Sequence, residues 1–108
     1  MDTGTPRMLE WSDWQLLQAQ RAYTKELSIL RTDAMQLSQA LDQQPNPVMT
    51  QFLIKQIAQH TKEGDPSLAN ARLALENAAL NVRDWSTGTL DRDTAILSLQ
   101  DLLPLLQQ

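Results

Sequence analysis

The side chains that could carry chemistry are few and widely separated. The single histidine, His60, precedes Glu63 by three residues, a spacing that would let both side chains bind one metal ion from a helix. A di-metal bundle needs several more glutamates and a second histidine on facing helices, and this chain has four Glu in total. We therefore predict no metal site. We place His60 on a solvated surface near a helix C-terminus, where a protonated imidazole is favoured.

The segment from Asp91 to Thr94 has the acidic spacing that begins a calcium-binding loop. Ile96 occupies the sixth position, where such a loop needs glycine, and the closing glutamate is absent. We therefore interpret Asp91 as the cap of a helix.

No nucleophile is paired with a base in this sequence. The chain has no cysteine, one histidine and no glycine-rich loop of the kind that binds phosphate. Carboxylates such as Glu10, Asp13, Asp33 and Glu76 fall on the polar sides of the helical patterns described below. We predict a non-catalytic protein with no cofactor. A cryptic metal-binding or cofactor-binding bundle is kept as an alternative.

The elements that would position these residues are helices. Nineteen Leu and eleven Ala against six Val plus Ile favour helix over strand. Glycine and proline divide the chain into four uninterrupted segments. We predict an all-α, antiparallel bundle with coiled-coil-like packing, in one domain over residues 11–108 after a flexible leader, residues 1–10. The expected helices cover residues 12–43, 47–63, 66–87 and 91–103.

Capping residues mark the expected helix ends. Candidate N-caps are Ser12, in a capping box with Gln15, then Asn46 and Asp65, each followed by proline, and Asp91. We expect Gly64 and Gly88 to be left-handed C-caps, and Pro104 to end or kink the last helix.

The first helix carries apolar residues at alternating spacings of four and three. This stripe consists of Leu16, Gln20, Tyr23, Leu27, Leu30, Ala34, Leu37 and Leu41, with Gln20 as its one polar member. A helix of about 30 residues is roughly 45 Å long, so it could extend beyond its neighbours. Part of the stripe would then remain for a second copy or a partner.

Six residues are the candidate contacts for such a partner. They lie at the start of the first helix and around Pro104: Trp11, Trp14, Leu17, Leu102, Leu105 and Leu106. Tryptophan is enriched at interface hot spots, and the C-terminal leucines match an L-x-x-L-L helix-in-groove pattern. The alternative is internal: the tryptophans would close the open end of the bundle over Trp85 or the last helix, and the leucines would pack in the core.

Charge limits the classes of partner. The formal net charge is -4, the pI is about 4.7, and nine basic residues are scattered without a cluster, which disfavours nucleic acid and anionic membranes. No apolar run is long enough to span a membrane. We expect a cytoplasmic interaction module, such as an assembly factor, secretion chaperone or regulatory adaptor, that binds a partner or forms a homodimer. The alternative is a small subunit or inhibitor of a nucleoprotein complex, acting as an acidic mimic or through Arg72 and Arg83.

Overall fold

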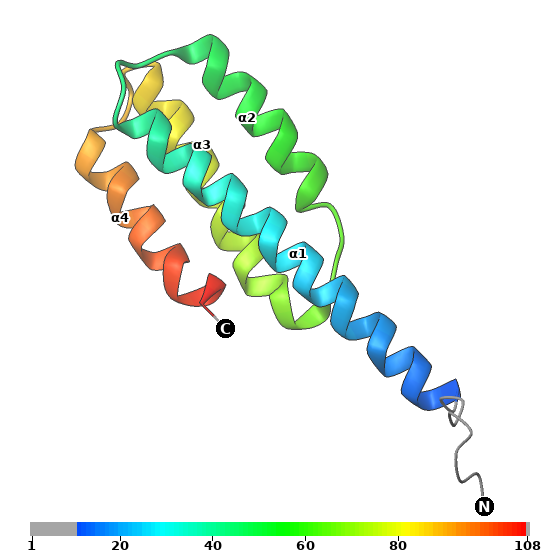
Figure 1. Cartoon of the computed structure of the whole chain (residues 1–108). Coiled ribbons are helices and arrows are strands. Elements are labelled where there is room, and N and C mark those ends of the chain that lie inside the picture. Colours follow the sequence, from blue (N-terminus) through cyan, green and yellow to red (C-terminus); the bar gives the residue numbers. More distant parts are fainter. Residues whose placement is uncertain (1–10, 108) are drawn as a thin grey trace, which may run out of the picture.

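The computed structural model describes residues 11–107, which form four α-helices and two short 3-10 helices, with no strand among them (Figure 1). The predicted leader, residues 1–10, lies outside the described residues. The elements in chain order are α1 (Trp11–Leu41), α2 (Pro47–His60), η1 (Pro66–Leu68), α3 (Ala69–Ser86), α4 (Arg92–Leu102) and η2 (Leu103–Leu106).

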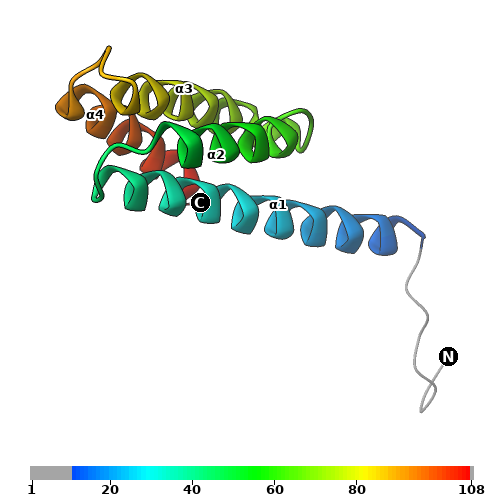
Figure 2. The same ribbon diagram turned by 90° about the horizontal axis from the view of Figure 1, so that it is seen from above.

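The helices pack as an antiparallel bundle, because each short connection reverses the chain direction (Figure 1). Helices α1 and α3 each contact both α2 and α4, and they also contact one another. Figure 2 shows α1 running along one side of the group formed by the other three. The predicted all-α bundle with a long first helix is confirmed.

Two of the predicted N-caps form in full. The Asn46 side chain accepts a hydrogen bond from the Met49 N–H, with Pro47 at the first helical position. The Asp91 carboxylate accepts bonds from the backbone N–H and the hydroxyl of Thr94. These two bonds, the hydroxyl bond first, lower the pKa of Asp91 from its usual value.

The other two expected helix starts differ from the prediction. Asp65 accepts bonds from the hydroxyl and N–H of Ser67, which lower the pKa of its carboxyl, but the turn that it caps is η1, and α3 follows from Ala69. Helix α1 already includes Trp11, so Ser12 lies inside it.

The two glycines at helix ends have different roles. Gly88 has φ +84°, and the N–H groups of Gly88 and Thr89 bond the carbonyls of Trp85 and Asp84, as in a Schellman motif. The same prediction for Gly64 is wrong. Gly64 does not have positive φ, and α2 ends earlier, at His60, with Thr61 as its C-cap.

The core lies between the four helices and is mostly leucine and alanine. Leu30, Leu37, Leu75 and Leu102 are fully buried. On α3 the buried positions include alanines, among them Ala71, Ala78 and Ala79; these small residues let α1 and α3 approach across the bundle.

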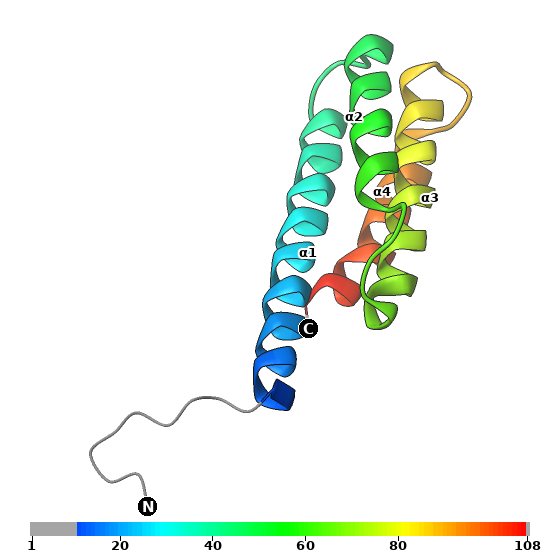
Figure 3. The same cartoon turned by 90° about the vertical axis from the view of Figure 1, so that its right-hand side faces the viewer.

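Helix α1 extends well beyond the other three helices at its N-terminal end (Figure 3). Its buried residues begin only at Leu27. Leu16 and Gln20, the first two members of the predicted stripe, are exposed, and Tyr23 is half-buried. Residues 11–25, here called the α1 arm, therefore have no side chain fully covered by the rest of the chain.

Candidate protein-interaction surface

The α1 arm exposes large apolar side chains that a folded chain normally buries. The exposed fractions are 71% for Trp11, 41% for Trp14 and 60% for Leu16, and Leu17 is half-buried. The alternative in which both tryptophans close the open end of the bundle is wrong, because both side chains are exposed and precede the first buried residue of α1, Leu27. Trp85 is instead half-buried against the core.

The base of the arm is fixed by a hydrogen-bonded acidic side chain. Glu26 Oε1 accepts a bond of 2.7 Å from the Asp65 N–H, and Glu26 Oε2 accepts one of 2.6 Å from Arg72 Nη1. Both charged side chains are largely buried, at 14% and 13% exposure. The carboxylate is therefore held against the turn between α2 and α3 at the level where α1 leaves the bundle.

This arrangement explains why glycine stands at position 64. A Cβ added there would overlap the Glu26 carboxylate, which Arg72 and the Asp65 N–H hold in place. Gly64 thus permits a close approach rather than a left-handed turn.

The C-terminal candidates occupy a different environment from the tryptophans. Leu102 and Leu106 are 0% and 2% exposed, and Leu105 packs against the same core. Helix α4 ends before Pro104, and η2 turns the chain back so that the Leu106 carbonyl accepts a 2.6 Å bond from Arg31 Nε on α1. Of the two alternatives for these leucines, the structure places them in the core of the chain.

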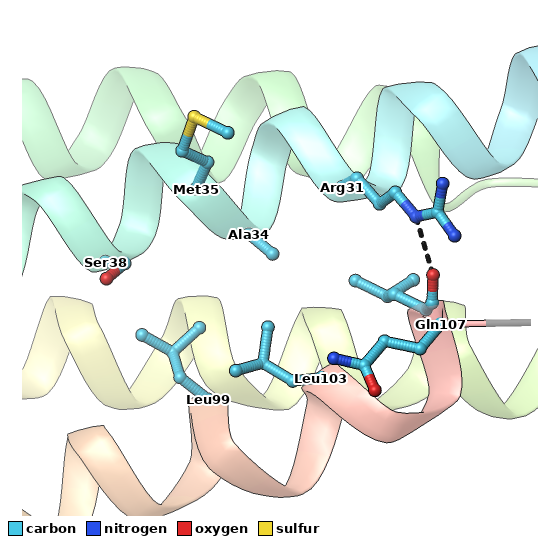
Figure 4. Close-up of a pocket in the computed structure, with 8 residues that line it drawn as sticks. Arg31, Ala34, Met35, Ser38, Leu99, Leu103 and Gln107 are labelled. Atoms are coloured by element: carbon cyan, nitrogen blue, oxygen red, sulfur yellow. Dashed lines mark hydrogen bonds between the residues drawn. The ribbon is translucent and has the colours of Figure 1, made fainter.

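A groove runs between α1 and the C-terminal turn. It encloses about 410 Å³, and its walls are Ala34, Met35 and Ser38 on one side and Leu99 and Leu103 on the other (Figure 4). Met35 is 60% exposed and Leu103 is 46% exposed. Leu103 was not among the candidates taken from sequence, although its place beside Leu102 in the leucine-rich tail could have indicated it.

Other helices also expose apolar side chains, and a depression of similar volume, about 410 Å³, lies over Val48 and Phe52 on α2. Val48, Met49 and Phe52 are exposed on α2, Leu73 and Leu80 on α3, and Leu97 on α4. Scattered exposed leucines are ordinary on protein surfaces. The arm differs because it carries two exposed tryptophans and Leu16 on the part of α1 that precedes its first buried residue, Leu27.

Sequence reasoning missed a buried polar cluster between α1 and α2. Asp33 is 1% exposed, and its two carboxylate oxygens accept bonds from Gln56 Nε2 at 2.9 Å and from His60 Nδ1 at 2.7 Å. Gln56 Nε2 also donates to Gln36 Oε1 at 2.7 Å. The assignment of Asp33 to a polar helix side is therefore wrong. Its position three residues after Leu30 and four before Leu37 could have indicated burial.

The sequence predicted a solvated His60. In the structure its side chain is only partly exposed and belongs to this cluster. The His60 side chain is 33% exposed and bonds a buried carboxylate. This pairing orients the imidazole, yet no hydroxyl or thiol is joined to it by a hydrogen bond in the described residues. The cluster joins α1 to α2.

The structure of residues 11–107 also bears on the predicted metal and nucleic-acid alternatives. The described part of the chain has no group of three His, Cys, Asp or Glu side chains that could hold a metal ion. Arg72 and Arg83, proposed as partners for nucleic acid, form ion pairs with Glu26 and Asp84. Among the described helices, none has the length and apolarity to cross a membrane.

Comparisons with known proteins found no matching family model, curated protein or solved structure.

Proposed function

We propose that this chain is a non-catalytic interaction module that binds another protein chain through the α1 arm. The observation that carries the proposal is the exposure of Trp11, Trp14 and Leu16 on a helix that extends beyond its own bundle. Burying a large apolar side chain stabilises a contact by about 1.5–3 kcal/mol. The arm therefore offers several such gains at little cost, because it is already helical and anchored at Glu26.

The arm suits a protein partner better than a phosphate-bearing one. Its exposed apolar residues include two tryptophans, and aromatic residues are enriched in protein interface cores. Such a module would act as an assembly factor, chaperone or adaptor, with the cytoplasm as its expected compartment. No observation favours the nucleoprotein alternative or the metal-binding alternative over this one.

Paired double variants test the proposal. Leu16→Glu with Leu17→Glu places two charges on the arm, while Leu73→Glu with Leu97→Glu places two charges at exposed leucines elsewhere. Each purified chain, checked for native helicity, is compared by light scattering and as bait with extract from its source. We expect the arm variant to lose an association, with itself or with another protein, that the control keeps. Identical behaviour of both double variants and the parent chain in both assays would refute the proposed role of the arm.

A further inference from the structure

Two cations of the α1 arm have no carboxylate partner within residues 11–107. Three arginines of the bundle do form ion pairs with carboxylates, namely Arg72, Arg83 and Arg92. Arg21 and Lys25 form no such pair in the described part of the chain, and both are exposed, one helical turn apart. The arm therefore presents two free positive charges on a chain whose formal net charge is -4.

The carboxylates of α1 that are closest in sequence to these cations are engaged inside the fold. Glu26 bonds Arg72, and Asp33 is 1% exposed. Asp13, the remaining carboxylate of the helix, lies about 12 Å along it from Arg21. The middle of α1 therefore shows mainly positive charge to solvent, although the chain as a whole is acidic.

Apolar side chains adjoin the two cations on the same side of the helix. Five residues follow one another at spacings of three or four positions and so share one side of α1: Trp11, Trp14, Leu17, Arg21 and Lys25. We call these five residues the arm strip. Both tryptophans are exposed, and a shallow depression of about 540 Å³ lies over Leu17, Arg21 and Lys25. The strip thus has an apolar end and a basic end.

We propose that the arm strip binds an acidic amphipathic helix of another protein. This inference rests on the proposed interaction role of the arm and names the chemistry of its partner. The apolar end of the strip packs against aliphatic side chains of the partner, and Arg21 and Lys25 meet its carboxylates. Charge complementarity of this kind speeds association and suppresses wrong partners.

Spacing along the arm sets the pattern that the partner carries. The midpoint between Trp14 and Leu17 lies about 11 Å along the helix from the midpoint between Arg21 and Lys25, which is about two helical turns. A partner helix lying along the strip therefore presents aliphatic residues and carboxylates about two turns apart on one side. A helix matches this surface because its own side chains also recur every three or four residues.

A phosphate-bearing partner fits the strip less well than an acidic helix. The affinity of a protein for nucleic acid rises with the number of phosphates that its cations contact, and the strip offers two cations. Neither DNA nor an anionic membrane supplies the aliphatic side chains that would cover the apolar end while carboxylates meet the basic end. Both serve as competing probes in the test.

A synthetic helical peptide is the probe. It carries two leucines and, about two turns further along the same side, two glutamates, and the anisotropy of a fluorescent label reports binding. We expect a dissociation constant of about 100 μM or lower, and weaker binding at about 0.5 M salt, which screens charge. An isomer with the glutamates on the opposite side, and a peptide with lysines in their place, should bind at least about fivefold more weakly. Equal binding of all three peptides, or no binding at about 1 mM, would overturn the inference.

Charge reversal on the protein uses a control that is matched in net charge. Arg21→Glu with Lys25→Glu should raise the dissociation constant of the acidic peptide at least about tenfold. Lys55→Glu with Lys62→Glu, at exposed lysines on and just after α2, changes the net charge equally and should raise it less than about twofold. Helix ellipticity checks that both variants fold. Equal weakening in the two variants would show a response to net charge alone and would exclude the strip as the site.

The outcomes also separate this inference from the proposed function. Tighter binding of double-stranded DNA or of phosphatidylserine vesicles than of the acidic peptide would reject the acidic partner. An association that is lost with Leu16→Glu and Leu17→Glu, but kept with Arg21→Glu and Lys25→Glu, would also reject it and would leave the arm as an interaction site. An association that survives both double variants would overturn both proposals, because it would not use the arm.

Discussion

Replacing His60 with alanine tests whether the polar cluster joins α1 to α2. The imidazole donates one of the two hydrogen bonds to the Asp33 carboxylate, which is 1% exposed. A hydrogen bond to a charged group contributes about 1.5–3 kcal/mol. Because the His60 side chain is 33% exposed, water can replace part of this bond. We therefore expect a loss of about 1.5–2 kcal/mol from the free energy of unfolding, the lower part of the range.

Urea unfolding followed by helix ellipticity measures this loss. In a domain of about 100 residues a change of this size lowers the melting temperature by about 6–15 °C. Gln59→Ala, at an exposed neighbouring position on α2, is the control and should change stability by less than about 0.5 kcal/mol.

A double-mutant cycle with Asp33→Ala separates the pair from its surroundings. We expect a coupling energy of at least about 1 kcal/mol between the two positions, since the side chains are in direct contact. A coupling energy near zero, with His60→Ala as stable as Gln59→Ala, would show that the bond does not hold α1 and α2 together.

Three further substitutions probe the arm base, a helix cap and the C-terminal turn. Gly64→Ala should lower the free energy of unfolding by about 1–3 kcal/mol, because it displaces the Glu26 carboxylate from two partly buried donors. The control Gly88→Ala meets open space and should lose only about 1 kcal/mol, because of its positive φ. Equal losses in urea unfolding would contradict this. The lowered pKa of Asp91 means that its stabilisation is present above the unfolded-state pKa and is lost as pH falls through the lower folded-state value. Melting temperatures between pH 5 and pH 2 should therefore fall less steeply for Asp91→Asn, which keeps the cap without a titrating group; an unchanged slope would contradict this. Leu106→Ala should lose about 2–5 kcal/mol, and a loss below about 1 kcal/mol would show that η2 is not part of the core.

Local patterns were enough to predict much of the fold. Asn46-Pro47, Asp91 and Gly88 form the caps that their types and positions indicate, because a cap depends on hydrogen bonds to residues only a few positions away. Pro104 ends α4 for a similarly local reason, since its ring cannot continue an undisturbed helix. The left-handed C-cap predicted at Gly64 does not form. The role of Gly64 depends on Glu26, which lies beside it in space but is distant in sequence.

The candidate surface was predicted only in part, because exposure depends on which helices end where. The sequence identified Trp11, Trp14 and Leu17 on one side and Leu102, Leu105 and Leu106 on the other as equivalent apolar clusters. Packing separates them. The first three lie on the part of α1 that extends beyond the other helices, whereas the last three lie at the end of α4 and in η2 and pack in or against the core. A leucine has the same hydrophobicity in both places, so composition alone could not distinguish them.

The four-helix bundle with a long first helix follows from the amino-acid sequence, because glycine, proline and apolar periodicity act within each segment. Three features depend on how the helices pack: α1 extends beyond the bundle, Asp33 is buried and bonded to His60, and a groove lies beside η2. These features depend on the relative lengths and axial positions of helices distant in sequence, which side-chain packing sets when the core closes.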